Sequence, residues 1–419
     1  MGNQIVKTGS VALVVLSIIA AISAVVTGVV IVVCVNVNIR LSADGIRFAQ
    51  PPRPVRGAET VPAVQTLFTE ASGQAQGGGV SAASPPDGRS EREKPPKTDI
   101  GRTPELTQVI LSLAGDCTLG QSYGSASPRH FSAFYESKPK EYFFEGVSGV
   151  FASDDITIVN LEGPLTRSTV IRGKPEDGPK YWFKGAPEYA EILSAGSVEI
   201  ANLANNHTRD FGDEGYRDTK AALAGAGVGY FGNDDVLTRQ IRGIKIGFFG
   251  LSASAGAGVI KERISALRRA GAQVIIASFH GGLPVATYIP TPAQKRAAYA
   301  AIDNGAAFVV EHHPHVLQGI EHYNGGVIAY SLGNFCFGGN TNPSDKDTMI
   351  FQIVITKMAD KLYGTYRVIP ASISSHDDYN DYRPRLLVGE EAKNVLDKVA
   401  RLSIGTDAAS PRGLSVMLP

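Results

Sequence analysis

Beyond about residue 105, short apolar runs rich in β-branched residues alternate with longer amphipathic segments. The apolar runs predict strands at 107–114, 156–160, 198–204, 244–250, 272–279, 306–310 and 326–333. Apolar positions at helical spacing predict helices at 214–227, 260–271, 291–305 and 390–402, and each of the first three ends at a glycine, as helices often do. This alternation is typical of an α/β domain.

Two further apolar runs lie near the end of this region, at residues 348–358 and 362–373. Their closeness along the chain predicts an antiparallel pair, because such strands need only a tight turn between them. Together with the α/β pattern, this predicts stacked sheets with flanking helices in a domain over residues 105–405, followed by a C-terminal tail at 406–419.

An uninterrupted apolar run near the N-terminus, residues 10–35, contains no charged side chain. As a helix it would be roughly 39 Å long, which exceeds the ~30 Å hydrocarbon core of a bilayer. A buried soluble helix rarely stays apolar on all sides for so long, and a cleaved signal peptide has a shorter core and a small-residue cleavage site. We therefore expect a transmembrane anchor at 10–36, with residues 1–9 cytoplasmic and the C-terminal domain extracytoplasmic. Lys7 before the run favours this orientation, although Arg40 follows it.

Residues 37–104 are rich in Pro, Gly and Ser and poor in large apolar side chains. Such a segment buries too little surface to offset its ordering entropy, so we expect a disordered linker, with one short helix at 58–71.

Composition narrows the classes of partner. Lys and Arg number 40, as do Asp and Glu, and this balance predicts no nucleic-acid partner. The three cysteines make no CxxC zinc pattern and no disulfide framework.

Polar side chains follow five of the predicted strands, at the point where each strand ends. The residues are Asp116; Asn160 and Glu162; Asn205, Asn206, His207 and Asp210; His280; and Glu311, His312, His313 and His315. Ligands of open α/β sheets bind at the carboxyl ends of strands, so we expect these side chains to converge.

Carboxylate, imidazole and amide oxygen together form a ligand set for a divalent cation such as Zn, Mn, Fe or Mg. An acid that bridges two cations would make a two-metal site. Singly, each residue has a commoner explanation as a turn, a helix cap or a hydrogen-bonded side chain. Convergence at five strand ends favours the metal site, whereas His130, His322 and His376 lie outside the pattern and are expected to be ordinary side chains.

The motifs "GDCTLG", "NLEGPLT", "LANNHTRDFG" and "HGG", with the segment from "PTPAQ" through "EHHPH" to "SLGNF", resemble the capsule-synthesis protein CapA family. That family is linked to poly-γ-glutamate production and is related to calcineurin-like metallophosphoesterases. The resemblance covers residues 106–337, with a continuation to about residue 402. It implies a metallophosphoesterase-like layered β-sandwich flanked by helices, and an N-terminal membrane anchor.

The resemblance also implies a role for each residue. Two divalent metal ions would be held by Asp116, Glu162, Asn206, His280, His313 and His315, with Glu162 as the bridging acid. His207 would be the general acid, and Asn160, Asn205, Asp210, Glu311 and His312 would support the ligands. The chain departs from the family pattern at Thr118, Gly281, Leu283 or Pro284, and Glu311, where the family has His, Trp, Glu and Gly, respectively. The extra acid at Glu311 would either add a ligand or disturb a turn that Gly allows.

Two functions remain open. The chain is either a membrane-anchored, metal-dependent hydrolase or transferase acting on a phosphoester or on the amide backbone of an anionic polymer, or a non-catalytic accessory subunit. The accessory subunit would bind or guide poly-γ-glutamate beside a membrane synthase.

The anchor can be tested by fractionation. The intact protein should sediment with membranes, and a chain that starts near Glu105 should stay in the supernatant, because it lacks the apolar run. Recovery of the intact protein free in the medium, or of a chain cut just after the apolar run, would contradict the anchor.

Overall fold

A computed structural model describes residues 40–42, 45–47, 106–125, 127–173, 181–283, 287–404 and 416–418. The chain divides into two compact units, Met1–Arg92 and Glu93–Pro419. In the first unit, β1 (Arg40–Ser42) pairs antiparallel with β2 (Gly45–Arg47). This hairpin lies inside the predicted linker, where no regular structure was expected.

The predicted anchor at 10–36 and the predicted helix at 58–71 lie outside the described residues. Among the residues that are described, no helix combines the length and apolar character that a membrane span requires.

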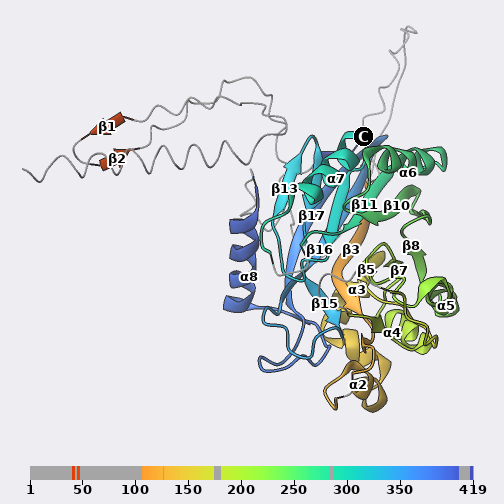
Figure 1. Cartoon of the computed structure of the whole chain (residues 1–419). Coiled ribbons are helices and arrows are strands. Elements are labelled where there is room, and N and C mark those ends of the chain that lie inside the picture. The colour runs from red at the N-terminus through yellow and green to blue at the C-terminus, as the bar shows by residue number, and fades with distance from the viewer. Residues whose placement is uncertain are drawn as a thin grey trace, which may run out of the picture. The chain divides into compact units, whose positions relative to one another are not determined.

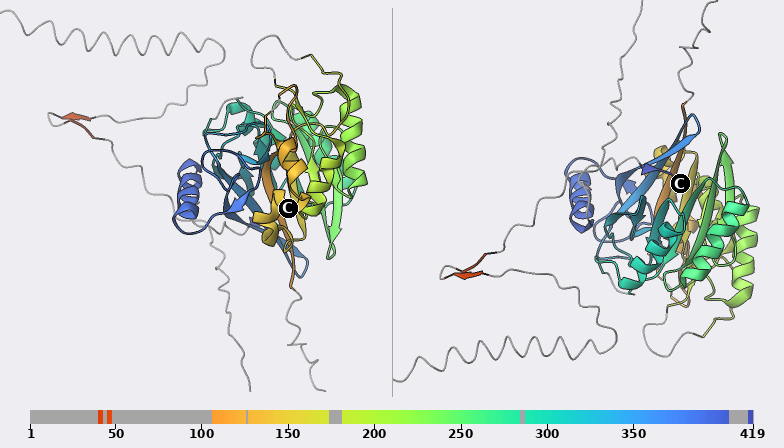
Figure 2. Two further views of the ribbon diagram at one scale, coloured as in Figure 1. Left: turned by 90° about the horizontal axis from the view of Figure 1, so that it is seen from below. Right: turned by 90° about the horizontal axis from the view of Figure 1, so that it is seen from above.

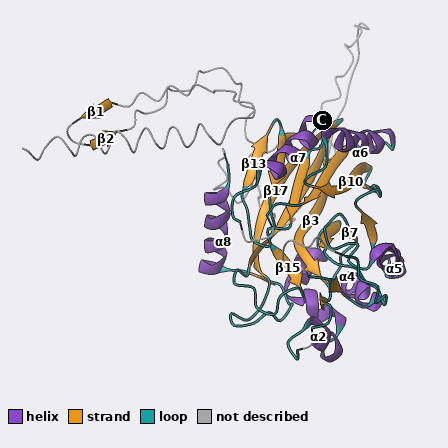
Figure 3. Ribbon diagram, viewed as in Figure 1, coloured by secondary structure: helices purple, strands orange, loops and turns teal. Residues whose placement is uncertain are grey.

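The second unit contains two large sheets (Figures 1 and 3). The first sheet has the order β18 (Arg385–Leu386), β17 (Lys361–Ser372), β16 (Asp347–Met358), β3 (Leu106–Thr118), β5 (Ile156–Leu161), β7 (Ile200–Asn202) and β8 (Gly229–Phe231); β15 (Asn334–Phe337) pairs with β3, and β19 (Val416–Met417) with β17. The second has the order β13 (Ile320–Tyr323), β14 (Gly326–Ala329), β12 (Phe308–His312), β11 (Val274–His280), β10 (Ile244–Ser252) and β9 (Leu237–Ile241). A small antiparallel pair joins β4 (Gln121–Ser122) to β6 (Phe183–Lys184).

The two sheets share one hydrophobic core. Leu111 and Ile158 of the first sheet belong to the same buried cluster as Phe248, Ile276 and Val310 of the second. The sheets therefore pack face to face as a sandwich, as predicted.

Helices cover the outer faces of both sheets. The second sheet packs against α6 (Ala257–Arg269) and α7 (Pro292–Asp303). The outer face of the first sheet packs against α2 (Phe131–Ser137), η1 (Lys140–Val147), α3 (Ser148–Phe151), η2 (Pro187–Tyr189), α4 (Ala190–Ala195) and α5 (Gly212–Gly225). Figure 2 shows α8 (Gly389–Leu402) at the opposite edge of the sheets from α5. The layered α/β architecture predicted from the sequence is confirmed.

Local predictions agree in part. The antiparallel pair is confirmed as β16 and β17. Gly227, Gly271 and Gly305 follow α5, α6 and α7 with φ of 75°, 85° and 105°, the left-handed backbone that favours glycine after a helix. The strand predicted at 198–204 is shorter, Ile200–Asn202, and that at 326–333 ends at Ala329.

Within each of the two large sheets, the carboxyl ends of the parallel strands lie at the same edge. In the first sheet, β3, β5 and β7 run parallel, with Asp116 opposite Asn160. In the second sheet, β10, β11 and β12 run parallel, with His280 opposite His312. Both sets of strand ends carry the polar residues singled out above.

The backbone is tight at Gly115, where the register of β3 against β5 shifts just before Asp116. A Cβ at Gly115 would lie 2.1 Å from the carbonyl oxygen of Gly333. The nearest atoms to this Cβ would be the carbonyl oxygen and carbonyl carbon of Gly333. Both belong to the backbone, so they cannot move away without displacing the chain that carries them.

We expect Gly115→Ala to lower the free energy of unfolding by roughly 1–3 kcal/mol, since overpacking forces a backbone shift. The matched control is Gly149→Ala in α3, where a Cβ would meet no atom within 4 Å. Chemical denaturation measures both, and equal midpoints for the two variants would contradict the assigned clash.

Candidate metal centre

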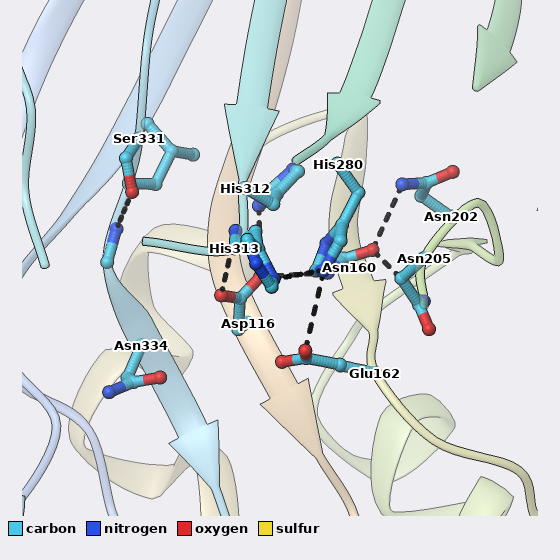
Figure 4. Close-up of polar contacts among 12 residues, drawn as sticks. Asp116, Asn160, Glu162, Asn202, Asn205, His280, His312, His313, Ser331 and Asn334 are labelled. Carbon is cyan, nitrogen blue, oxygen red and sulfur yellow. Dashed lines mark hydrogen bonds and ion pairs between the residues drawn. The ribbon is translucent and has the colours of Figure 1, made fainter. Parts of the chain in front are cut away.

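The polar strand-end residues lie together at the edge where the two sheets meet (Figure 4). Asp116 is near the end of β3, and Glu162 directly follows β5. His280 is the last residue of β11, and His313 directly follows β12. The predicted convergence is thus present in the fold.

One group of potential ligand atoms gathers around His280. Its Nε2 lies 3.5 Å from Oε1 of Glu162, 3.1 Å from Nδ1 of His313 and 2.6 Å from Oδ1 of Asn206. The Glu162, His280 and His313 atoms all lie within 4.8 Å of one another.

A second group gathers around His315. Its Nδ1 lies 3.2 Å from Oδ2 of Asp116 and 3.9 Å from Oε2 of Glu162. The atoms of Asp116, Glu162 and His315 also lie within 4.8 Å of one another. Glu162 belongs to both groups, and presents a different carboxylate oxygen to each histidine.

The spacing of these atoms fits divalent cations. Ligand atoms held tetrahedrally at about 2.0–2.1 Å from one zinc ion lie roughly 3.3 Å from each other. Asp116 and Glu162 are 0% exposed, and burying two carboxylates is costly unless positive charge compensates them. The donor set and its burial are therefore suited to metal.

Backbone strain coincides with the two histidines after β12. His313 has φ of 101° and His315 has φ of 58°, which non-glycine residues rarely adopt. Such conformations cost of order 1–3 kcal/mol each and persist where other interactions hold them. Here they turn both imidazoles toward the acids.

A network of amides and one histidine holds Asp116 in place. Asn160 Nδ2 donates to Oδ1 of Asp116 at 2.8 Å and lies 3.2 Å from Nδ1 of His280. Asn202 Nδ2 donates to Oδ1 of Asn160 at 3.0 Å, and His312 Nδ1 lies 3.3 Å from Oδ1 of Asp116. The expectation that Asn160 and His312 lie beside the ligands agrees with these contacts.

His207 stands next to the cluster without joining either group of potential ligands. Its Nδ1 lies 2.7 Å from Oδ2 of Asp210, and its Nε2 lies 3.9 Å from Oε1 of Glu162. Its ring packs against Phe183 at a centroid distance of 4.2 Å. Asn205 Oδ1 accepts the backbone N–H of His207 at 3.1 Å, so the turn after β7 fixes this imidazole from several sides.

The histidines of the cluster differ in their pKa values because their electrostatic environments differ. Burial lowers the pKa of His280 well below its ordinary value and that of His313 to about 4, so both imidazoles are neutral near pH 7. Burial would also lower the pKa of His315, but the charges of Glu162 and Asp116 raise it to about 9. Burial would raise the pKa of Asp116, but hydrogen bonds from His312 and His315 hold it well below its usual range. Neutral imidazole and ionised carboxylate are the forms that bind metal, so His280, His313 and Asp116 are already in these forms, whereas His315 would release a proton on binding metal.

The structure does not bring Glu311 to this cluster. Glu311 lies within regular strand β12, opposite Phe279, so it disturbs no turn. Val310 belongs to the core between the sheets, whereas Val309 packs under the helices, so alternation directs Glu311 to the helix side, toward Gln294 of α7. Burial there raises the pKa of Glu311 to about 8. The suggestion that Glu311 supports the ligands is wrong for this reason.

Asn334 contacts the cluster and was not predicted. Its Oδ1 lies 2.9 Å from Nδ1 of His315, and its Nδ2 donates to the carbonyl oxygen of His315 at 3.1 Å. It begins β15, opposite Asp116 in β3. Asn334 directly follows the run predicted as a strand at 326–333, so the rule applied to the other strand ends would have found it.

His322, expected to be an ordinary side chain, has its Nε2 2.9 Å from the hydroxyl of Tyr366. Of the positions that depart from the family pattern, Thr118 is buried, Leu283 is exposed and Pro284 lies outside the described residues.

Comparison with known proteins identifies relatives of the chain. The sequence profile of the family described as "Bacterial capsule synthesis protein PGA_cap" matches residues 110–339. The "Capsule biosynthesis protein CapA" of Bacillus anthracis is 26% identical over 259 residues, which are 56% of this chain and 61% of that protein. The "PGA biosynthesis protein CapA" of Bacillus subtilis is 27% identical over 289 residues, 63% of this chain and 72% of that protein. The chain thus spans less than two thirds of the Bacillus anthracis protein.

Two further similarities cover other proteins. A Mycobacterium tuberculosis protein named "Probable polyglutamine synthesis accessory protein" is 27% identical over 212 residues, 43% of this chain and 55% of that one. Among solved structures, the calcineurin-like phosphoesterase YfkN from Bacillus subtilis aligns with 71% of this chain and 98% of that one, at 13% identity and a TM-score of 0.35.

Metal content tests the two groups. We expect Asp116→Ala, His280→Ala and His313→Ala each to lower bound divalent metal, because each removes a donor atom from a buried site. Glu162→Gln should lower it further than His313→Ala, since only Glu162 belongs to both groups. Elemental analysis of the purified protein measures this, with thermal unfolding as the check on folding.

His322→Ala is the matched control, because His322 contacts Tyr366 and neither group. Wild-type metal content in all four site variants would show that these atoms do not hold metal.

Proposed function

We propose that this chain, which belongs to the bacterial capsule synthesis protein family, takes part in the synthesis of a poly-γ-glutamate capsule. Its membership of that family confirms the resemblance predicted from its motifs. In this proposal it is a hydrolase or transferase that uses two divalent ions and acts on an anionic polymer or on a phosphoester. Two relatives bear the name CapA, and one of these is named for PGA biosynthesis.

The single observation that carries the catalytic part is the position of Glu162. One buried carboxylate offers Oε1 to His280 and Oε2 to His315, as a bridge between two neighbouring ions would. When bound, two such ions activate water and stabilise both oxygens of a displacement. Asp116 and His315 would hold one ion, and His280 and His313 the other, with Asn206 beside His280.

His207 supplies the acid in this proposal. Asp210 holds the Nδ1 side of the ring, which leaves Nε2 directed toward Glu162 and the space around it. Orientation by a carboxylate fixes the tautomer and steadies the charged imidazolium. His207 can therefore donate a proton from Nε2 to a leaving group without being a metal ligand.

We place the chain at the cell membrane as part of the same proposal. Residues 10–36 would anchor it once and leave the domain extracytoplasmic, beside the synthase that makes the polymer. Support comes from the uncharged apolar run and from the Pro-, Gly- and Ser-rich composition of the residues that follow.

An accessory function is the second candidate. The Mycobacterium tuberculosis relative is named a synthesis accessory protein, and several positions near the cluster depart from the family pattern. A non-catalytic subunit would bind the polymer and need no proton donor.

A substitution at His207 separates the two. We expect His207→Asn to keep its metal and its polymer binding but to lose about 10²–10⁴-fold in turnover, the usual contribution of general acid catalysis. Turnover is measured on an aryl phosphoester and on poly-γ-glutamate. Capsule formation is measured in cells that carry the variant. Asp210→Asn should fall between His207→Asn and the wild type, because it leaves the imidazole in place but removes the carboxylate that orients it.

His376→Asn is the control, since His376 stacks on Tyr379 and belongs to neither group of potential ligands. Full capsule production by His207→Asn would favour the accessory function instead.

A further inference from the structure

A cavity of about 330 Å³ is lined by residues of strands β4 and β6 and of the segments around them. Its volume is at the lower end of the range for small-molecule sites. Its lining includes Gln121, Ser122, Ser132, Thr166, Arg167 and Lys184. Both charged side chains among its lining residues are therefore cations.

Strand β6 connects this cavity to the centre. Phe183 packs on the ring of His207, and its backbone N–H donates to Oδ2 of Asp210 at 2.7 Å. Successive side chains of a strand point to opposite faces, so Lys184 points away from His207 and into the cavity. One two-residue strand thus separates the proposed proton donor from a cationic pocket.

Carbonyl oxygens and aromatic rings hold Lys184 in place. Its Nζ donates to the carbonyl oxygens of Ser168 at 2.6 Å and Arg167 at 3.4 Å, and lies 5.3 Å and 5.0 Å from the ring centroids of Tyr123 and Phe211. No carboxylate of the described residues lies within ion-pair distance of this ammonium group. Burial, with repulsion from Arg167, lowers the pKa of Lys184, and the charge of a bound anion would raise it.

Arg167 is already partly neutralised. Its Nη2 lies 3.1 Å and 3.0 Å from the two carboxylate oxygens of Glu188. Asp218 also accepts a hydrogen bond from the hydroxyl of Thr166. Among these groups Lys184 is therefore the cation most available to a ligand.

We propose that this cavity is a subsite for a carboxylate of the polymer, which Lys184 binds while a neighbouring unit of the same chain lies at the metal centre. A polymer of γ-linked glutamate carries one carboxylate on every unit, so a chain that crosses β6 would offer charge on both sides of the strand. This inference rests on the proposed function for the nature of the polymer.

Binding of glutamate oligomers to the metal-loaded full chain tests the subsite. Lys184→Gln should weaken binding about tenfold, because it removes a charge-assisted hydrogen bond and leaves a neutral polar side chain that is one atom shorter. Glu188→Gln should tighten binding severalfold, because it releases Arg167 from its ion pair. Raising the salt concentration should weaken wild-type binding more than binding by Lys184→Gln.

Lys393→Gln on α8 is the matched control, because it removes the same charge from an exposed ion pair with Asp397 and should leave binding unchanged. Metal content should stay at the wild-type level in all of these variants. That measurement separates the subsite from the metal centre. If Asp116→Ala loses metal but Lys184→Gln binds the oligomer as tightly as the wild type, the subsite is refuted and the metal centre is not.

Three probes identify the source of the anion. A free oligomer should bind more tightly than inorganic phosphate. An oligomer with its carboxylates blocked as methyl esters should bind the wild type and Lys184→Gln with equal affinity. If inorganic phosphate shows the same affinity and the same dependence on Lys184 as the oligomer, the pocket takes small anions and the proposal is wrong. Equal oligomer affinity for wild type, Lys184→Gln and Glu188→Gln would also overturn it.

Discussion

Asp116 and Glu162 bring two carboxylates, both inaccessible to solvent, to the edge where two sheets meet. An isolated buried charge is so unfavourable that the protein must compensate it with hydrogen bonds, opposite charge or metal. Much of the surrounding structure can be understood as that compensation. Asn160 and His312 contact one oxygen of Asp116, and His315 contacts the other. The strained backbone after β12 is the means by which imidazoles reach both acids.

The same constraint explains how much the sequence could predict. Apolar runs followed at once by Asp, Glu, Asn or His revealed the ends of buried parallel strands, because charged and amide side chains are uncommon inside strands that are covered on both faces. Convergence followed from strand direction alone. The error at Glu311 came from ending the strand at residue 310. The strand continues to His312, and alternation then sends Glu311 under α7.

Features that depend on distant pairing were not predictable in this way. Strand β15 has four residues and joins β3 through an irregular register, so the pairing of the two strands could not be predicted, although Asn334 itself follows a predicted strand. Strand β6 has two residues, too few to show any periodicity, yet it places Phe183 against His207 and Lys184 in the cavity. Short elements of this kind are fixed by tertiary packing rather than by local pattern.

The geometry around His207 bears on whether the candidate metal centre is catalytic or purely structural. A purely structural metal site needs closed coordination and gains nothing from an oriented imidazole outside the ligand groups. Here Asp210 accepts from both His207 and the backbone of Phe183, so one carboxylate fixes the position of the ring and of the strand beside it. That carboxylate is buried, and the imidazole that it orients packs on Phe183 and belongs to neither group of potential ligands. An imidazole held in this way, 3.9 Å from the shared acid, favours proton transfer as the reason for its position.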